Sequence, residues 1–207
     1  MPEHVPPGRA GRLWLRTRLQ ATRRSAELLD RKRQLMRHEL TRLEVARETT
    51  ERAWRDACTD AELWGRRAIE LGGISDVALA AADIDGQSLV ELSWHNTMGV
   101  VHPDEPTVHL ARLAPSAAAS ANAAIGPAAE AYRQALNSGA MHAATEASYQ
   151  RLRSALLATE RRLRAIERHR IPVLEDELAR VDLRLDELER EERVVTRWAK
   201  SAPGRNS

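Results

Sequence analysis

Hydrophobic residues between Leu13 and Leu71 recur at alternating steps of four and three residues, which is the spacing of a coiled-coil seam. The stripe begins at Leu15, and its polar positions are Thr22, Arg33, Arg47 and Thr50. A 3.5-residue repeat of this length indicates a long helix that packs in a left-handed coiled coil. The stretch contains no proline, and Gly72-Gly73 predicts its end, because glycine favours the position after a helix C-terminus.

The pattern changes to strand-like alternation in residues 74–115. The alternating apolar residues are Val77, Leu79 and Ala81, followed by Val90, Leu92 and Trp94. Asp85-Gly86 lies between the two runs, and Asp-Gly between alternating runs predicts a β-hairpin turn. Pro103 and Pro106 interrupt the next extended stretch, which favours a sheet edge or a loop over a central strand. We expect this hairpin to pack on the helices, since an isolated hairpin is only marginally stable.

A second helical stripe occupies the C-terminal part of the chain. Its apolar positions include Leu152, Leu156, Leu163, Ile166, Leu174, Leu178, Val181, Leu185, Leu188 and Val195. Between Ile166 and Leu178 the spacing slips to steps of four beside Pro172, which predicts a kink and not a break. The expected fold is mainly α: a long antiparallel two-helix coiled coil with a small β-hairpin insertion between the helices.

This pattern divides the chain into three working segments and two tails. We expect an N-terminal coiled-coil helix over 9–71, a hairpin and loop insertion over 72–115, and a C-terminal coiled-coil helix over 116–200. Residues 1–8 and 201–207 are expected to be disordered tails.

Charge predicts how the two helices pair. Residues 9–37 carry ten basic and two acidic residues, a net of +8, whereas residues 175–192 carry nine acidic and three basic residues, a net of −6. An antiparallel hairpin places these segments side by side, whereas a parallel homodimer would stack like charges. Aligning the two charged segments predicts that Leu29 lies near Val181 and Leu43 near Glu167.

Composition limits the function classes. Aromatic residues make up 3% of the chain and the formal net charge is only +2, which favours a helical rod over a globular core and gives little support for nucleic-acid binding. A single cysteine, Cys58, excludes an internal disulfide framework. No apolar run reaches the ~20 residues of a membrane span, and the N-terminus does not resemble a signal peptide, so we expect a soluble intracellular chain.

Two groups of residues could suggest a metal site. His95, His102 and His109 recur every seven residues near Asp104 and Glu105, and Asp83 to Gly86 faintly resembles a calcium loop. A zinc or other metal site is conceivable at the histidines, but scattered histidines on a hairpin are favoured. The calcium-like loop lacks a third ligand and the required spacing, so a turn is favoured there. Trp54 lies on the helical stripe and is expected to pack in the seam.

Three motifs occur in a fixed order along residues 9–200. The N-terminal motif is GRLWLRTRLQATRRSAELLDRKRQLMRHEL, the middle one is NTMGV followed by a proline three residues later, and the C-terminal one is ERRLRAIERHRIPVLEDELARVDLRLDELEREE. In this order they resemble the D subunit of V/A-type rotary ATPases and ATP synthases, a central-stalk protein. The family-motif residues are Asn96, Met98, Gly99, Val100, Pro103 and Pro172. The chain departs from the family pattern at Ser25, Asp30, Arg164 and Arg193, which affects contacts at those positions only.

The resemblance implies a mechanical function without catalytic residues or a cofactor. Family members form the shaft in the axis of a hexamer of catalytic and non-catalytic nucleotide-binding subunits, bind a small stalk partner, and reach the membrane ring through a funnel-like subunit. The ion that the ring carries is proton or sodium, and the complex is cytoplasmic and membrane-associated. Two alternatives remain: a freestanding coiled-coil scaffold or regulator, and a nucleic-acid-binding helical hairpin.

The seam residues expected to build such a shaft come from both stripes. They are Leu15, Leu19, Thr22, Leu29, Leu43 and Trp54 on the first helix, and Leu163, Ile166, Leu178, Val181, Leu185 and Leu188 on the second.

Overall fold

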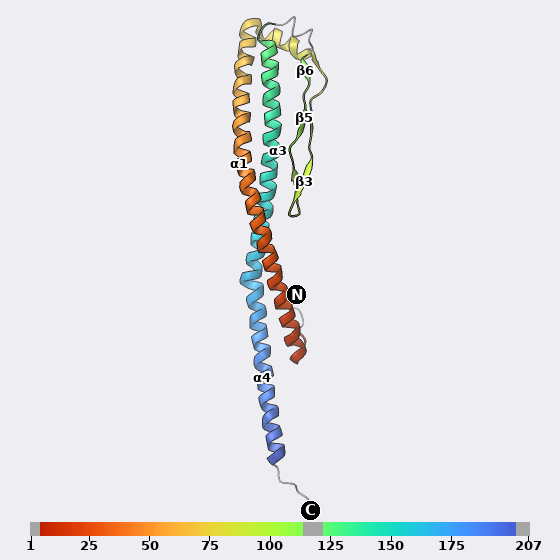
Figure 1. Cartoon of the computed structure of the whole chain (residues 1–207), viewed down its shortest axis with the longest axis vertical. Helices are drawn as coiled ribbons and strands as arrows, with labels where there is room; N and C mark the ends of the chain where they lie inside the picture. The colour runs from red at the N-terminus through yellow and green to blue at the C-terminus, as the bar shows by residue number, and fades with distance from the viewer. Residues whose placement is uncertain (1–4, 114–121, 202–207) are drawn as a thin grey trace, which may run out of the picture. The chain divides into compact units, whose positions relative to one another are not determined.

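The computed structural model describes residues 5–113 and 122–201 (Figure 1). The chain is mainly helical, as expected: α1 is Gly8–Ala82, α3 is Ile125–Ala165 and α4 is Ile171–Ser201, and a five-residue π-helix, Ile166–Arg170, joins α3 to α4. Two compact units result: a terminal unit, Met1–Arg33 with Ala158–Ser207, and a central unit, Gln34–Leu157. Most of the two tails that were expected to be disordered lies outside the described residues.

α1 is interrupted at Gly73, and the helix then resumes. Gly73 has φ 72° and ψ 174°, a conformation that an L side chain rarely adopts. The helix was expected to end at this glycine pair, whereas it is interrupted there and resumes. The segment after it was expected to be a strand, and this was wrong, because it is helical as far as Ala82. Val77 and Ala80 both pack in the cluster around Ile125, and their i, i+3 spacing is that of one helix face and not of an alternating strand.

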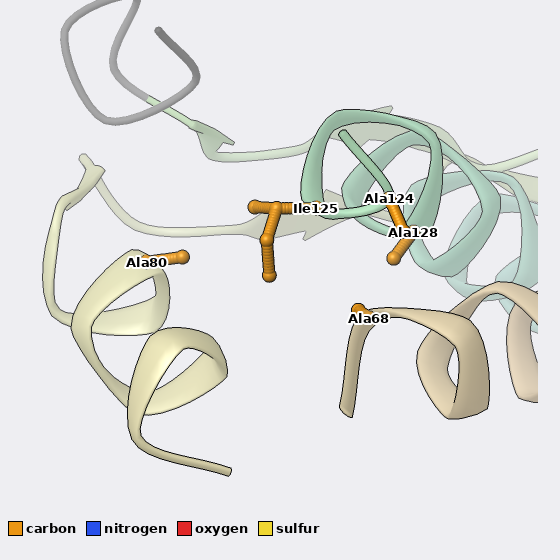
Figure 2. Close-up of a cluster of buried hydrophobic side chains, with 5 residues drawn as sticks. All are labelled: Ala68, Ala80, Ala124, Ile125 and Ala128. Carbon is orange, nitrogen blue, oxygen red and sulfur yellow. The ribbon is translucent and has the colours of Figure 1, made fainter. Parts of the chain in front are cut away.

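Small residues form the core at this end of the central unit. Figure 2 shows Ile125 directed toward Ala80 and Ala68, with Ala124 and Ala128 beside it. These alanines are nearly inaccessible to solvent, so the helices approach closely here.

Asn122 joins the interrupted end of α1 to the start of α3. Its Nδ2 donates to the carbonyl of Ala68 at 3.2 Å and to Oδ2 of Asp76 at 3.3 Å, and its Oδ1 accepts from the backbone N–H of Ala124 at 3.1 Å. One amide side chain therefore bonds to backbone groups near the end of one helical segment and at the start of another.

The segment between the helices forms a long two-stranded antiparallel ribbon. Its strands are β1 (Ile84–Asp85), β2 (Leu89–Glu91), β3 (Trp94–Thr97), β4 (Val100–Pro103), β5 (Thr107–His109) and β6 (Arg112–Leu113). The nested pairs are β1 with β6, β2 with β5 and β3 with β4. Within the central unit the ribbon runs alongside α3 (Figure 1).

The turn of this ribbon is at Met98-Gly99, so the prediction of a turn at Asp85-Gly86 was wrong. Met98 has φ 53° and Gly99 has φ 81°, and two successive positive values define the hairpin turn that matches the twist of the flanking strands. Gly86 also has a positive φ, of 84°, but it follows β1 at the base of the ribbon. The Asp-Gly signal therefore marks a bend, and the hairpin closes inside the NTMGV motif.

The irregular spacing beside Pro172 corresponds to the π-helix. The backbone N–H of Ile171 bonds to the carbonyl of Ile166, five residues earlier. Pro172 has no N–H to donate, and its ring would clash with the carbonyl four residues before it in a regular helix. A π turn contains one residue more than an α-helical turn. This additional residue accounts for the steps of four between apolar positions in the sequence beside Pro172.

In the terminal unit, the residues before α1 fold back against the helix. Val5 packs against the cluster around Leu15, and Gly8, at φ 68°, sets the reversal. Gly11 is buried beneath this segment, and a Cβ atom at Gly11 would lie 2.0 Å from the carbonyl oxygen of Pro6. The absence of a side chain at Gly11 is thus what admits the folded-back segment.

Gly11→Ala should release this segment. Alanine favours the helix by up to ~1 kcal/mol, but its methyl group must displace Pro6. Deleting residues 1–7 should lower the free energy of unfolding of the wild type by about 1 kcal/mol, because the packing of Val5 is lost. The same deletion in the Gly11→Ala variant should cause no further decrease, because the segment is already released. The free energy of unfolding, measured by urea denaturation for all four chains, checks this.

Gly126→Ala is the matched control, since a Cβ there meets no atom within 4 Å. In the Gly126→Ala variant, deleting residues 1–7 should lower the free energy of unfolding as much as it does in the wild type. If the deletion had this same effect in the Gly11→Ala variant, the folded-back segment would not depend on Gly11.

Candidate functional site

The start of α1 packs against α4 through a small apolar cluster. Leu15, Leu19 and Leu174 are buried, and the half-buried residues packed on them are Val5, Trp14, Ile171, Leu178 and Val181. Burying one such leucine contributes about 2 kcal/mol, so this cluster supplies most of the attraction between the two helices in the terminal unit.

Ion pairs cross from α1 to α4 beside this cluster. Arg9 and Glu189 are 3.3 Å apart, Arg12 and Asp182 are 2.6 Å apart, and Arg23 and Glu175 are 2.6 Å apart. The order of the partners along the two helices is antiparallel. All three pairs are partly exposed, so each contributes only about 0.5 kcal/mol, and their effect is on direction and register more than on stability.

The register differs from the predicted one. Val181 packs with Leu15 and Leu19 and not with Leu29, and Leu43 packs with Leu152 and Leu156 and not near Glu167. The prediction aligned the whole basic segment 9–37 with the whole acidic segment 175–192. Specific ion pairs and leucine packing instead match the acidic segment to the first half of the basic one.

The remaining expected seam residues occupy a range of environments. Leu163 and Leu185 are buried in the terminal unit, and Leu43 is buried in the central unit. Thr22, Leu29 and Ile166 are half-buried, whereas Leu188 is 53% exposed.

Trp54 lies at the edge of the helix pair in the central unit. It is 39% exposed, and its ring stacks on His142 of α3 with ring centroids 5.5 Å apart. The ring of His142 also shares a hydrogen bond with Thr50 at 3.2 Å. Gly139 lies beneath the indole, where a Cβ atom would be 3.0 Å from its Nε1 atom. The sequence analysis missed His142 and Gly139, and the only available signal was a glycine inside a helical stretch.

The tip of the ribbon explains the NTMGV motif. Asn96 Oδ1 accepts a hydrogen bond from the backbone N–H of Gly99 at 2.9 Å, which holds the turn closed. Thr97 pairs with Val100, and its hydroxyl lies 3.0 Å from Nε2 of the buried His102. The other ring nitrogen of His102 lies 3.1 Å from the carbonyl of Pro103, so Nδ1 carries the proton and donates to it.

The ribbon tip is fastened to α3 by contacts with β3 and β4. The hydroxyl of Ser148 donates to the carbonyl of Pro103, and Arg151 Nη1 donates to the carbonyl of Val101 at 3.2 Å. The Arg151 guanidinium also lies over the ring of Trp94, 4.9 Å from its centroid. Val100 packs on the cluster of Met36, Leu43, Leu152 and Leu156. Sequence analysis missed Ser148 and Arg151, because a helix surface gives no sign of which strand covers it.

α1 carries a polar pair near the same tip. Arg42 donates hydrogen bonds of 2.5–3.0 Å to Glu39, which lowers the pKa of the Glu39 carboxyl and raises the pKa of Arg42. Smaller contributions come from His102, which further lowers the pKa of Glu39, and from Asp104, which further raises that of Arg42.

The residues considered for metal binding do not converge. His95 and His102 meet edge to face with centroids 5.7 Å apart, whereas His109 pairs with Leu89 in a different part of the ribbon. Across residues 5–113 and 122–201, no three His, Cys, Asp or Glu side chains are grouped so that they could hold a metal ion.

An apolar pocket of about 300 Å³ lies where the interrupted end of α1, the ribbon base and α3 meet. Its walls include Ile69, Val77, Ile84, Ile125 and Tyr132. In the part of the chain that is described, no helix combines the length and the apolar character needed to cross a membrane.

The described residues therefore form packing surfaces on long helices together with a ribbon that is anchored to α3. Compared with protein families, the chain matches the ATP synthase D subunit over residues 13–201. The chain belongs to this family, the D subunits of V/A-type ATP synthases, whose members are stalk components of rotary ATPases. Comparison with curated proteins gives no match.

Ser148→Ala should loosen the ribbon tip. The carbonyl of Pro103 would lose its donor from α3, which costs about 1 kcal/mol, and the amides of 94–103 should exchange hydrogen faster. Hydrogen–deuterium exchange of the full chain measures this.

Ser154→Ala is the matched control, because Ser154 is exposed on the same helix. It should leave exchange in the ribbon unchanged. Equal exchange in both variants would show that Ser148 does not hold the tip.

Proposed function

We propose that this chain is the central rotor shaft of a V/A-type ATP synthase or ATPase. It transmits torque between the nucleotide-binding hexamer and the membrane ring that translocates protons or sodium ions. The observation that carries the proposal is the match to the D subunit family over residues 13–201. The antiparallel contacts within each unit support it, because a shaft needs two helices that brace one another.

The proposed shaft is an antiparallel two-helix coiled coil. In the terminal unit, the proposal is supported by the packing of Leu15 and Leu19 on Leu174. It is also supported by the ion pairs from α1 to α4, whose partners follow one another in antiparallel order. In the central unit, Met36 and Leu43 pack on Leu152 and Leu156. Two paired helices bend and twist less than one, which suits torque transmission. The proposed segments are the helices within 9–71 and 116–200 and the insertion within 72–115.

The partners that we infer are the catalytic and non-catalytic subunits of the hexamer, a small stalk subunit and a funnel-like subunit above the ring. Large apolar side chains remain exposed along α4 and around the interruption of α1. They are Leu183, Val194, Val195 and Trp198, and Leu71, Ile74 and Leu79. Exposed apolar residues in such groups are typical of surfaces that other subunits cover. The chain would then be cytoplasmic and associated with the membrane through its complex.

In this function the chain contributes no catalytic residue and binds no cofactor. ATP hydrolysis and synthesis belong to the hexamer, and ion transport belongs to the ring. The proposed shaft needs stiffness, which the packing between two helices provides. It also needs contact surfaces for other subunits, which exposed charged and apolar side chains provide.

Breaking the helix contact should uncouple the motor. Leu19→Asp combined with Leu185→Asp places carboxylates at two buried positions, which costs several kcal/mol and separates the helices. We expect the reconstituted complex to hydrolyse ATP with poor coupling to ion transport. Parallel assays of hydrolysis and ion pumping in vesicles measure the ratio.

Arg16→Ala is the control, because Arg16 is exposed and its loss should change the free energy of unfolding by less than ~1 kcal/mol. It should keep the wild-type ratio of ions moved per ATP. Unchanged coupling in the double variant, or a wild-type chain that fails to join the motor, would refute the shaft function.

A further inference from the structure

The apolar pocket of about 300 Å³ in the central unit has a buried floor and an exposed rim. Its floor includes small residues that are almost inaccessible to solvent, namely Ala68, Ala80 and Ala128, together with Ile125, which lies among them in Figure 2. Large apolar side chains that remain exposed line its rim: Ile69, Ile84, Tyr132 and Leu136. A ligand in the pocket would remove apolar surface of both the rim and the ligand from water.

The walls of the pocket are held in place by hydrogen bonds that do not involve a ligand. Asn122 bonds to the carbonyl of Ala68, before the interruption of α1, and to the carboxylate of Asp76, after it. At the ribbon base, Ile84 of β1 pairs with Leu113 of β6. The pocket is therefore largely formed in advance, so a ligand need not order its walls on binding.

The chemistry of the walls suits a hydrocarbon. Side chains with polar groups line the pocket at Ser88, Tyr132 and Arg133, and the other lining residues are glycine or aliphatic. The hydroxyl of Ser88 accepts a hydrogen bond from the backbone N–H of Ala111 at 3.2 Å, and Arg133 Nη1 donates to Glu130 at 2.6 Å. Two of these polar groups are thus bonded within the protein, and walls of this kind hold water poorly and accept apolar molecules.

The size of the pocket indicates how much hydrocarbon it can hold. A cavity of about 150 Å³ accepts benzene, so a pocket of about twice that volume has room for about ten to twelve carbon atoms. The α3 wall extends from Ile125 to Leu136, which is about 16 Å along the helix axis. A volume of 300 Å³ spread over this length is narrow, which favours one extended chain over a fused ring system.

We propose that this pocket binds the hydrocarbon chain of a single-chain amphiphile, with the polar head of the amphiphile at the exposed rim. The bound chain contacts both segments of α1, the ribbon base and α3, so it stabilises their arrangement. The amphiphile is either free in solution, as a fatty acid is, or part of a membrane lipid. The proposal goes beyond the shaft function and does not depend on it.

The first test is calorimetric titration of the full-length chain with straight-chain carboxylates from hexanoate to tetradecanoate, each below the concentration at which it forms micelles. The affinity should increase about fourfold with each added methylene, because each methylene is buried in the pocket. It should level off at about twelve carbon atoms, where the pocket is full. Absence of dodecanoate binding, or an affinity that increases without levelling off, would overturn the proposal.

The second test fills the pocket. Ala129→Leu places a larger side chain in the α3 wall, and Ala81→Leu does so in the wall that follows the interruption of α1. Each should weaken dodecanoate binding roughly tenfold or more, because the added methylenes occupy the space of the ligand. Circular dichroism should show unchanged helicity, since the new side chains enter free volume.

Ala143→Leu is the matched control, because Ala143 is exposed on the same helix as Ala129 and does not line the pocket. It should bind dodecanoate as the wild type does. If both filling variants kept the wild-type affinity, the carboxylates would be bound elsewhere and the proposal would be wrong. The shaft function would stand in that case, because it does not require a ligand.

Sedimentation with phosphatidylcholine vesicles distinguishes the two sources of the hydrocarbon chain. Vesicle binding that the wild type shows and that Ala129→Leu loses would identify a membrane lipid. Dodecanoate binding without vesicle binding would identify a free amphiphile. Vesicle binding that is equal in the wild type and both filling variants, without dodecanoate binding, would overturn the pocket as the site.

Discussion

The structure depends on the apolar stripe of α1, which cannot remain exposed to water along a helix of 75 residues. In the terminal unit leucines cover it, with Leu15 and Leu19 against Leu174. In the central unit Met36 and Leu43 meet Leu152 and Leu156, and alanines such as Ala61 and Ala131 take over nearer the interruption of α1. The stripe therefore requires a second helix, and the chain supplies it.

Charged side chains add a weaker preference for the antiparallel order of the two helices. The ion pairs of Arg9, Arg12 and Arg23 are partly exposed and individually weak, but they all favour the same antiparallel order. Farther along α1, Arg47 pairs with Glu146 of α3 at 3.5 Å, so ion pairs between the antiparallel helices also occur in the central unit.

The sequence was sufficient to predict a mainly helical chain, a break in the helix at the Gly72-Gly73 pair, the irregularity beside Pro172 and the family, although the helix was expected to end at the glycine pair and instead resumes. Each of these depends on periodicity or on the special backbone of glycine and proline, which are local properties. The helical segment ending at Ala82 was mistaken for a strand because Val77, Leu79 and Ala81 alternate, whereas the packed residues Val77 and Ala80 have helical spacing. The turn at Met98-Gly99 was missed because Asp85-Gly86 gave the stronger local signal.

Register and tertiary anchors could not be predicted in this way. The offset between the helices depends on which leucines interlock and on pairs such as Arg12 with Asp182, and charge averaged over whole segments does not resolve it. Ser148 and Arg151 act on the ribbon through backbone carbonyls of Val101 and Pro103, which leave no trace in the spacing of α3.

The central claim is that the helices pair within one chain in this register. Crosslinking with a short bifunctional maleimide tests it in a Cys58→Ser background, with cysteines replacing either Arg12 and Asp182 or Leu29 and Val181. The account predicts an intrachain crosslink for the first pair and none for the second, whose members are offset by about 20 Å along the helix axis. Crosslinks that form only between chains, or only in the second pair, would contradict it.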